Sequence, residues 1–339
     1  MIILGIETSC DETSAAVIKT QDNNRINLLS NVVASSLSLH AQTGGIIPEV
    51  AAREQVKYII PVIQEALSVL KNPKDEVDAI SVTVGPGLIG SLLVGVETAR
   101  TIAYVWNKPI IGVNHLFGHI YSNWINTNED EIKFPAIALI VSGGHTDLVL
   151  IKNHKDIKWL GGTRDDAAGE AFDKTGRILG FSYPAGPQIE KMAKKITNDY
   201  YSFPRPLIDS ADFDFSFSGL KTAVLREIQK INNFDEPTVS RICFSLQEAV
   251  FGVLTTKTLS ATQKYNAKSI LLGGGVAANQ TLRKKFEFKI QELKLKTPLF
   301  IPEKKLCTDN AAMIATAAFF NYQKTPWKNL SANPELYFD

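Results

Sequence analysis

The chain has 339 residues, enough for two domains of ordinary size, and 45% hydrophobic with 21% charged residues is a globular composition. The formal net charge of +1 gives no sign of a nucleic-acid partner for the molecule as a whole, and no apolar run reaches the ~18 residues of a membrane helix. Three widely spaced cysteines argue against a disulfide framework and for a reducing compartment. The first residues lack the pattern of a signal peptide, so we expect a cytoplasmic protein without a membrane segment.

The first predicted elements are a strand, a polar turn and a second strand. Residues 2–6 are apolar, residues 7–14 collect hydroxyls and carboxylates, and residues 15–18 are apolar again. Hydroxyls and backbone N–H groups in such a turn can hold phosphate oxygens, and Asp11 and Glu12 are near enough to position a metal or a proton. An ordinary hairpin turn fits the same residues, and both interpretations stay open.

A helix, a strand and a second helix are predicted next. Residues 49–70 have helical spacing, interrupted by Pro61, which should end or kink the helix. Residues 79–84 are a β-branched strand that enters the turn Gly85-Pro-Gly87, and an apolar helix follows from 88 to about 105. In α/β folds, a glycine turn between strand and helix brings backbone close to a ligand.

Two histidines follow the next predicted strand, residues 108–113. His115 and His119 are spaced i,i+4, which places both rings on one face of a helix, and Asn114 is a suitable N-cap. Two imidazoles on adjacent turns can bind one divalent metal if a carboxylate completes the set, and Asp309 is the candidate. Such a set suits Fe(II) or Zn(II). A surface helix with two unrelated histidines remains the alternative.

The second half of the chain repeats this plan. A strand, a polar glycine turn and a returning strand correspond to residues 2–18, and they lie at 136–141, 142–146 and 148–151. A strand, a glycine turn and a helix correspond to residues 79–105, and they lie at 269–272, 273–275 and after Asn279. The repeat predicts two like lobes around a central cleft. We expect a first lobe of residues 1–113 completed by 309–339, and a second lobe of residues 114–308.

The second copy is longer between its two turns, which predicts an insertion at about 153–222 with its own task. In it, Asp166, Glu170 and Asp173 would share one helix face, either as a site or as an acidic first turn that complements the helix dipole. Residues 212–221 alternate aromatic and polar side chains, as a strand or an exposed aromatic platform would. Basic residues cluster at 191–195, at 283–285, and at 304–305 just before Asp309, where they would attract a polyanion.

In this order, the motifs resemble those of the TsaD family, the tRNA threonylcarbamoyladenosine transferases once called glycoproteases. The resemblance runs over nearly the whole chain and is carried by Gly5–Ser14, Gly85–Gly87 with Gly90 and Ser91, Asn114 and His115 with His119, Val141–His145, Asp165–Lys174, Phe215–Lys221, Gly273–Gly275 with Asn279, and Cys307–Asn310. It implies the duplicated α/β fold of actin, sugar kinases and Hsp70 ATPases. Two positions depart from the family pattern: Ala185 stands where the family often has Gly, and Glu190 where it often has Asp.

The resemblance also implies a ligand set. His115, His119 and Asp309 would bind one Fe(II) per subunit, with Zn(II) possible in vitro. Threonylcarbamoyl-adenylate, the activated substrate, would be held by residues of the second half: Ile140, Val141, Ser142, Gly143, Gly144, Asp173, Gly186, Glu190 and Asn279. The partners would be tRNA and TsaB-like and TsaE-like subunits, because a chain of near-zero net charge should hold tRNA weakly.

The implied reaction is acyl transfer. The exocyclic amine of the adenosine just 3′ of the anticodon, in tRNAs reading codons that begin with A, would attack the threonylcarbamoyl group and release AMP. Asp11 and Glu12 are the candidate proton acceptors. Three alternatives are an ATP-dependent sugar or acid kinase of the same fold, a metalloprotease, and a non-catalytic ATPase or scaffold. A kinase needs no histidine metal site, and no glutamate stands beside His115 to activate water for a protease.

Overall fold

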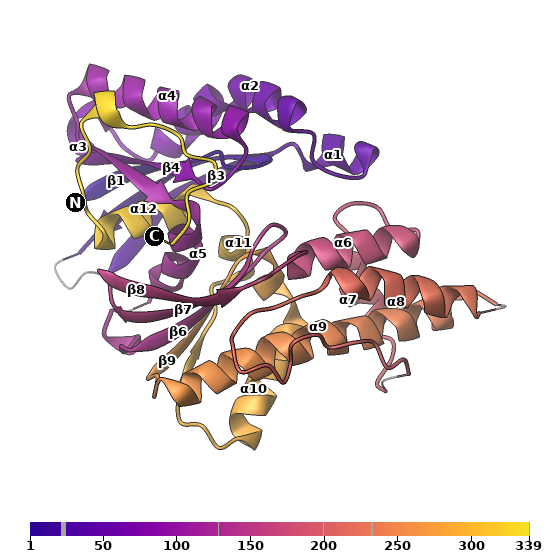
Figure 1. Ribbon diagram of the computed structural model, residues 1–339. Coiled ribbons are helices and arrows are strands. Elements are labelled where there is room, and N and C mark those ends of the chain that lie inside the picture. The colour runs from indigo at the N-terminus through magenta and orange to yellow at the C-terminus, as the bar shows by residue number, and fades with distance from the viewer. Residues whose placement is uncertain (22–24, 128, 199, 232, 339) are drawn as a thin grey trace. The chain divides into compact units, whose positions relative to one another are not determined.

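The structure is a computed structural model that describes residues 1–21, 25–127, 129–198, 200–231 and 233–338. The chain forms two compact units, one of Met1–Ile132 with Pro302–Asp339 and the other of Lys133–Ile301. Each unit contains one five-stranded sheet (Figure 1). The sheets can therefore be compared strand by strand.

The two sheets have the same strand order. The first sheet runs β3-β2-β1-β4-β5 and consists of β1 (Ile2–Glu7), β2 (Glu12–Thr20), β3 (Ile26–Ser35), β4 (Ala79–Gly85) and β5 (Ile110–Asn114). The second runs β8-β7-β6-β9-β10 and consists of β6 (Ala136–Val141), β7 (Thr146–Asn153), β8 (Asp156–Gly162), β9 (Ser269–Gly273) and β10 (Leu299–Phe300). In both, the first three strands in sequence pair antiparallel and the last two add parallel. The predicted duplication of an α/β fold is confirmed.

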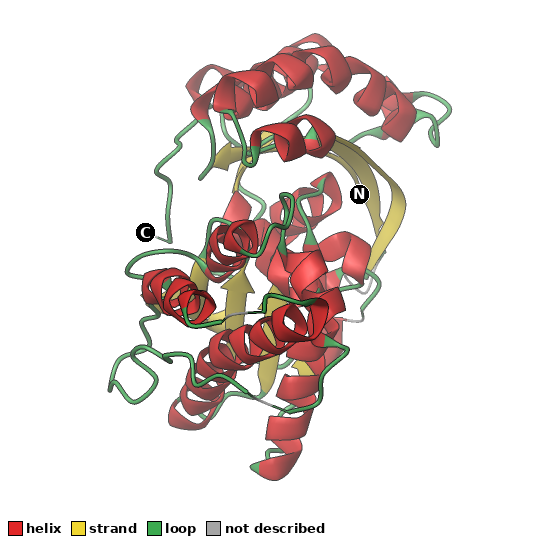
Figure 2. Ribbon diagram, turned by 90° about the vertical axis from the view of Figure 1, so that its right-hand side faces the viewer, coloured by secondary structure: helices red, strands yellow, loops and turns green. Residues whose placement is uncertain are grey.

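Successive side chains of β1 point to opposite faces of the first sheet, and helices pack against both faces. Leu4 and Ile6 join the core formed with α2 (Pro48–Leu67) and α4 (Ile89–Trp106). Gly5 points the other way, and a Cβ there would lie 2.3 Å from the Ala311 carbonyl oxygen of α12 (Ala311–Phe320). The missing side chain lets α12 approach the sheet closely. Figures 1 and 2 both show helices covering the strands of this unit.

Pro61 does not end α2, which was one of the two outcomes expected there. The helix continues through Pro61 as a single element of 20 residues. Proline removes one backbone hydrogen bond, which frees the carbonyl of Lys57, but Lys57 and Pro61 both lie on the exposed face. Because water can bind the freed carbonyl, the cost of the proline is small enough for the packing of the opposite face to keep the helix intact.

Residues 114–132, which the sequence analysis assigns to the second lobe, belong to the first unit. They form α5 (His115–Tyr121) and a short 3₁₀ turn, and both pack against α12. Ile125 also makes a bridge with Ile26 beside β3. This segment therefore belongs to the first unit because it packs against α12, a helix from the C-terminal part of the chain that lies on the first sheet.

The second unit builds its helices around α9 (Glu236–Lys264), which contacts β6, α7 (Gly186–Ala193) and α10 (Gln280–Glu292). The alternating aromatic segment is not an exposed platform, because Phe213, Phe215 and Phe217 are all buried. It is not a strand either, because residue 215 makes only an isolated bridge with Thr163 and residues 218–221 begin α8 (Ser218–Gln229). Within the described ranges no helix combines the length and apolar character needed to cross a membrane.

Candidate metal centre and ligand-binding turns

The two histidines lie on one face of α5, as predicted. Asn114 caps the helix by accepting a hydrogen bond from the backbone N–H of Leu116 at 2.8 Å. The rings of His115 and His119 meet edge to face, with centroids 4.6 Å apart, and both side chains are buried. The Asn114 amide also donates to the carbonyl of Tyr337, so the C-terminal segment anchors the start of the helix.

Asp309 reaches the histidines because α12 packs tightly on α5. A Cβ at Gly118 would lie 2.7 Å from Cδ1 of Ile314 and 3.1 Å from Cγ of Met313, so glycine leaves room there for these two side chains of α12. Asn310 caps α12 by accepting from the N–H of Met313, and Ser14 of β2 accepts from the N–H of Ala311. These contacts fix the turn that carries Asp309, far from α5 in sequence.

The three side chains form a group that fits one divalent cation. The Nε2 atoms of His115 and His119 lie 3.5 and 3.3 Å from the same oxygen, Oδ1 of Asp309, and one ligand atom from each residue lies within 4.8 Å of the others. Neither ring nitrogen of His119 makes a hydrogen bond of acceptable geometry with any described residue, although the ring is fully buried. Two imidazoles and one carboxylate match the donors that Fe(II) and Zn(II) prefer.

The pKa values of the two histidines are shifted in opposite directions. Burial lowers the pKa of His115, but the negative charges of Asp309 and Glu7 overcome it and raise the pKa to about 9. Burial lowers the pKa of His119 below its ordinary value. Burial and the charges of Asp309 and Asp11 raise the pKa of Glu12 to about 10. Negative charge is therefore concentrated in a desolvated space, which a bound cation would relieve.

Asp11 and Glu12 lie on the turn between β1 and β2, and the backbone of this turn is held from three directions. The Gln55 amide donates to the carbonyl oxygens of residues 8, 10 and 12 at 3.3, 2.9 and 3.1 Å. Ser91 of α4 donates to the carbonyl of residue 10, and Ser36 donates to that of Asp11. This turn, which we call the carboxylate turn (residues 8–12), is a buried and rigidly bonded structure.

The corresponding turn in the second unit, residues 142–145, is open; we call it the glycine turn. Ile140 and Val141 are buried at the end of β6, whereas Gly143 and Gly144 are exposed, and a Cβ at either would meet nothing within 4 Å. The start of α6 (Ala168–Ile178) packs on this turn through Gly169, whose N–H donates to the Ser142 carbonyl. Backbone amides beside a helix start can receive an anion.

The other predicted ligand residues of the second unit fall into two linked pairs. Asp173 accepts a hydrogen bond from the N–H of Ala185, beside Gly186, and burial raises the pKa of Asp173. Glu190 accepts from the N–H of Gln280, next to Asn279, which caps α10. Helix α7 carries both Gly186 and Glu190 and so joins the pairs.

Two further expectations concern charge. The three acids of the insertion do not act together, because Asp166 and Glu170 pair with Lys174 while Asp173 faces Ala185. Four of the eight basic residues in these clusters pair with an acidic neighbour, and the ion pairs are Lys194–Glu190, Lys195–Glu236, Lys285–Glu248 and Lys305–Glu303. These clusters therefore present less free positive charge than their sequences indicate.

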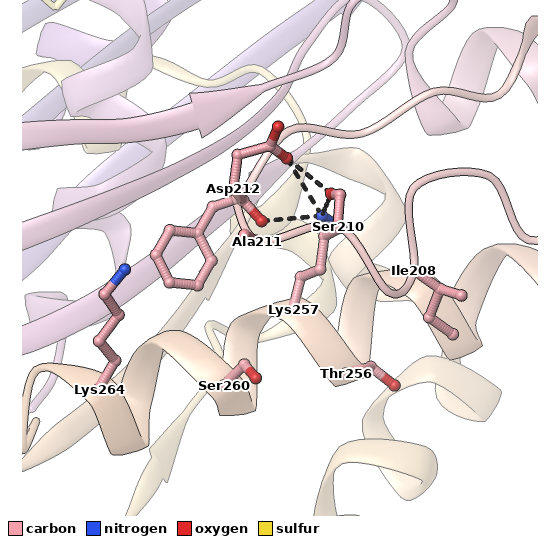
Figure 3. Close-up of a pocket in the computed structure, with 9 residues that line it drawn as sticks. Ile208, Ser210, Ala211, Asp212, Thr256, Lys257, Ser260 and Lys264 are labelled. Carbon is pink, nitrogen blue, oxygen red and sulfur yellow. Dashed lines mark hydrogen bonds and ion pairs between the residues drawn. The ribbon is translucent and has the colours of Figure 1, made fainter.

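A small cavity in the second unit lies apart from these residues. It is lined by the 208–213 segment and α9, and Figure 3 shows Lys257 reaching from α9 to Ser210 and Asp212. The ammonium group donates to the Ser210 hydroxyl at 2.8 Å and to the Asp212 carbonyl at 3.0 Å, with the Asp212 carboxylate at 3.6 Å. Three acceptors use its three protons, so Lys257 fastens this segment rather than offering an anion site.

The sequence analysis did not assign roles to two buried polar residues near the metal group. Glu7, at the end of β1, contacts His115, and Gln55, on α2, holds the carboxylate turn. A glutamate at the end of an otherwise apolar strand, and a glutamine on the buried face of an amphipathic helix, were available signals.

Comparison with known proteins agrees with this geometry. Residues 27–316 match the profile of the TsaD family, described as tRNA N6-adenosine threonylcarbamoyltransferase. Proteins of that name from Listeria welshimeri serovar 6b and Thermosipho africanus are each 48% identical to the chain, with 100% and 96% of this chain and 97% and 95% of theirs aligned. The relative from Moorella thermoacetica is 46% identical, over 98% of this chain and 96% of its own.

Solved structures support the fold. The chain superposes on HypF from T. kodakarensis with a TM-score of 0.64 at 15% identity, over 95% of this chain and 47% of that one. Full-length HypF in its phosphate- and nucleotide-bound form gives 0.60 at 12% identity, over 94% and 46%. The chain thus spans about half the length of these two proteins, and at this identity the likeness concerns the fold alone.

Proposed function

Because the chain belongs to the TsaD family of tRNA N6-adenosine threonylcarbamoyltransferases, we propose that it transfers the threonylcarbamoyl group from threonylcarbamoyl-adenylate to tRNA. The acceptor is the exocyclic amine of the adenosine 3′ of the anticodon in tRNAs reading codons that begin with A. We place the reaction in the cytoplasm, where such tRNAs are read.

One observation carries the metal part of the proposal. His115, His119 and Asp309 come from distant parts of the sequence, yet their ligand atoms lie within 4.8 Å of one another in a buried space. We assign one Fe(II) to these residues, with Zn(II) able to replace it in vitro. When bound, the cation supplies positive charge for oxygens that become negative during acyl transfer.

The activated substrate belongs to the second unit. The exposed backbone of Gly143 and Gly144 is suited to the phosphate of the adenylate. Ser142 closes the turn by donating its N–H to the His145 carbonyl, and Ile140 and Val141 form the buried strand that supports the turn. We assign the adenosine half to the side of Asn279, Glu190, Gly186 and Asp173. Glu190 can accept from ribose hydroxyls as an aspartate would, and Ala185 leaves the backbone near Gly186 accessible.

The chemical step is attack of the amine nitrogen on the carbamoyl carbon. A C–N bond forms, the bond between that carbon and the phosphate oxygen breaks, and AMP leaves with the electron pair. The amine proton must go to a base. We assign this role to Asp11 or Glu12, the two carboxylates of the carboxylate turn; in the metal-free chain, burial and the charges of Asp309 and Asp11 raise the pKa of Glu12.

Partners are needed for tRNA binding. The net charge is +1 and four of the eight residues in the basic clusters are ion-paired, so this chain alone offers few free cations to a phosphate backbone. We propose that TsaB-like and TsaE-like subunits complete the assembly and supply basic surface.

The outer face of α2 and α4 is suited to a TsaB-like subunit. Val56, Ile60, Ile89 and Leu93 are each between 44% and 63% exposed, and Val56 and Ile89 line a groove between these helices. Contiguous exposed apolar side chains commonly mark a protein interface. Val56→Glu should therefore prevent copurification with the TsaB-like subunit, whereas Lys57→Glu on the same helix should not.

The kinase alternative is not favoured, because the relatives compared above carry the transferase name and a kinase has no use for the buried histidine pair. Mass spectrometry of tRNA nucleosides after incubation with threonine, bicarbonate, ATP, tRNA and the partner proteins tests the proposal. We expect threonylcarbamoyladenosine with the wild-type chain. Its absence, together with transfer of the γ-phosphate of ATP to a sugar or acid, would support the kinase instead.

A further inference from the structure

Glu7 is a fully buried carboxylate at the end of β1, and it contacts the presumed metal ligand His115. One oxygen, Oε1, accepts a hydrogen bond from the N–H of Ser9. The other, Oε2, accepts from the hydroxyl of Thr83 on β4 and lies 3.1 Å from Nδ1 of His115. Each of the four side chains involved is at most 5% exposed, so water does not compete for these bonds.

The two nitrogens of His115 face different partners. Nδ1 faces Glu7, and Nε2 lies 3.5 Å from Oδ1 of Asp309, on the side where the ligand atoms converge. A neutral imidazole carries its proton on one nitrogen only, and the other nitrogen keeps the lone pair that binds a metal. A carboxylate can only accept, so the contact with Glu7 favours the proton on Nδ1 and leaves Nε2 free.

We propose that Glu7 is a positioning residue that holds His115 in its Nδ1–H tautomer and aims Nε2 at the cation, while Thr83 and the N–H of Ser9 hold Glu7 in place. This inference rests on the proposed metal site and deepens it. His119 has no equivalent partner, since its Nδ1 makes no hydrogen bond with a described residue. The two histidines therefore differ: Nδ1 of His115 faces Glu7, whereas His119 contacts Asp309 through Nε2 and has no hydrogen-bond partner on Nδ1 among the described residues.

A purely structural role is the competing explanation, because Glu7 also joins β1, β4 and the carboxylate turn. Glu7→Gln separates the two roles. The amide oxygen, in the place of Oε1, can still accept from the N–H of Ser9, whereas the N–H₂ takes the place of Oε2, where it faces Thr83 and His115. It then donates to the Thr83 hydroxyl and to Nδ1 of His115, which moves the imidazole proton to Nε2 and blocks the metal-binding lone pair.

Zinc titration of the metal-free proteins, with a competing chelator, measures the effect. We expect Glu7→Gln to weaken zinc binding by about 10- to 100-fold, as changes to a ligand's partner commonly do. The matched control is Ser9→Ala, which removes the second side chain near Nδ1 at 3.1 Å but keeps the N–H that holds Glu7, and it should stay within about threefold of wild type. Thr83→Val, which removes the hydroxyl that holds Oε2, should weaken zinc binding less than Glu7→Gln. Circular dichroism and thermal unfolding without metal check that each variant folds.

The wild-type protein provides a test that needs no variant. In the zinc-loaded chain with ¹⁵N-labelled histidine, NMR should show His115 protonated on Nδ1 and metal-bound through Nε2. The reverse assignment would overturn the inference, as would a folded Glu7→Gln variant with wild-type zinc affinity. A wild-type chain that binds no zinc and no iron would instead overturn the proposed metal site itself, which is a distinguishable result.

Discussion

The carboxylate turn and the glycine turn occupy the same position in two sheets of the same order, yet they are built in opposite ways. Side chains of α2, α4 and residue 36 bond to the carbonyl oxygens of the carboxylate turn. The glycine turn leaves Gly143 and Gly144 exposed, with space around them. One topology thus supports a rigid turn that concentrates negative charge and an open turn that offers backbone amides to a ligand. Each prediction below changes one turn or its surroundings and asks whether the other responds.

Removal of a metal ligand should have the largest effect. Asp309→Ala should weaken zinc binding by at least about 100-fold and abolish threonylcarbamoyladenosine, because two imidazoles alone hold the ion poorly. Adenylate binding, which we assign to the glycine turn, should be retained. Calorimetry for each ligand and nucleoside mass spectrometry measure these outcomes, with Glu303→Ala, an exposed carboxylate on the same segment, as the control.

Unchanged nucleoside yield from Asp309→Ala would remove the metal from the proposed mechanism. Loss of adenylate binding in the same variant would show that the two turns do not act separately.

The pH dependence of metal binding should be the next largest effect. The pKa of His115 is raised to about 9, so zinc must displace a proton at neutral pH, and its affinity should rise about tenfold per pH unit between pH 6.5 and 8.5. In the metal-free chain, the folding stability changes with pH in the opposite direction to the zinc affinity. The folded chain binds more protons than the unfolded chain, because the pKa values of His115 and Glu12 are raised to about 9 and about 10. The resulting stability is lost as pH rises from 6.5 through about 9 for His115, and from 4.5 through about 10 for Glu12.

Thermal unfolding with and without zinc across this range measures both slopes. The lowered pKa of His119 adds no slope above pH 6.5, because the ring is then neutral in both the folded and unfolded states. A melting temperature of the metal-free chain that rises between pH 6.5 and 9 would contradict the assignment.

Packing around the metal group is tested by Gly118→Ala. The added methyl would lie 2.7 Å from Cδ1 of Ile314, so the Ile314 and Met313 side chains must shift in a buried contact, and we expect a loss of roughly 1–3 kcal/mol in stability together with weaker zinc binding. Gly219→Ala is the control, since a Cβ there meets nothing within 4 Å. Equal melting temperatures for the two variants would show that the close approach is not needed.

Gly143→Ala should give the smallest change and probes the glycine turn. The chain should fold with wild-type stability and zinc affinity, because the methyl has open space around it. Adenylate binding should weaken about tenfold, a loss of about 1.4 kcal/mol, because the methyl would occupy space that the phosphate needs. Wild-type adenylate affinity would place the phosphate elsewhere.

Much of this arrangement could be predicted from local patterns. Buried strands, helix caps at Asn114 and Asn279, and the i,i+4 histidines all depend on residues close in sequence. The continuation of α2 through Pro61 could not be predicted, because hydrogen bonding of the freed carbonyl to water depends on which face is exposed in the folded chain. The partners of Glu7 and Gln55 could not be predicted either, because residues that each of them contacts lie between 43 and 108 positions away in sequence.

The most direct test of the metal centre is anomalous X-ray diffraction from crystals of the chain loaded with iron or zinc. One strong peak is expected about 2.0–2.2 Å from Nε2 of His115, Nε2 of His119 and a carboxylate oxygen of Asp309. A loaded crystal with no peak at these residues, or with the ion bound to other side chains, would contradict the central role given to this group.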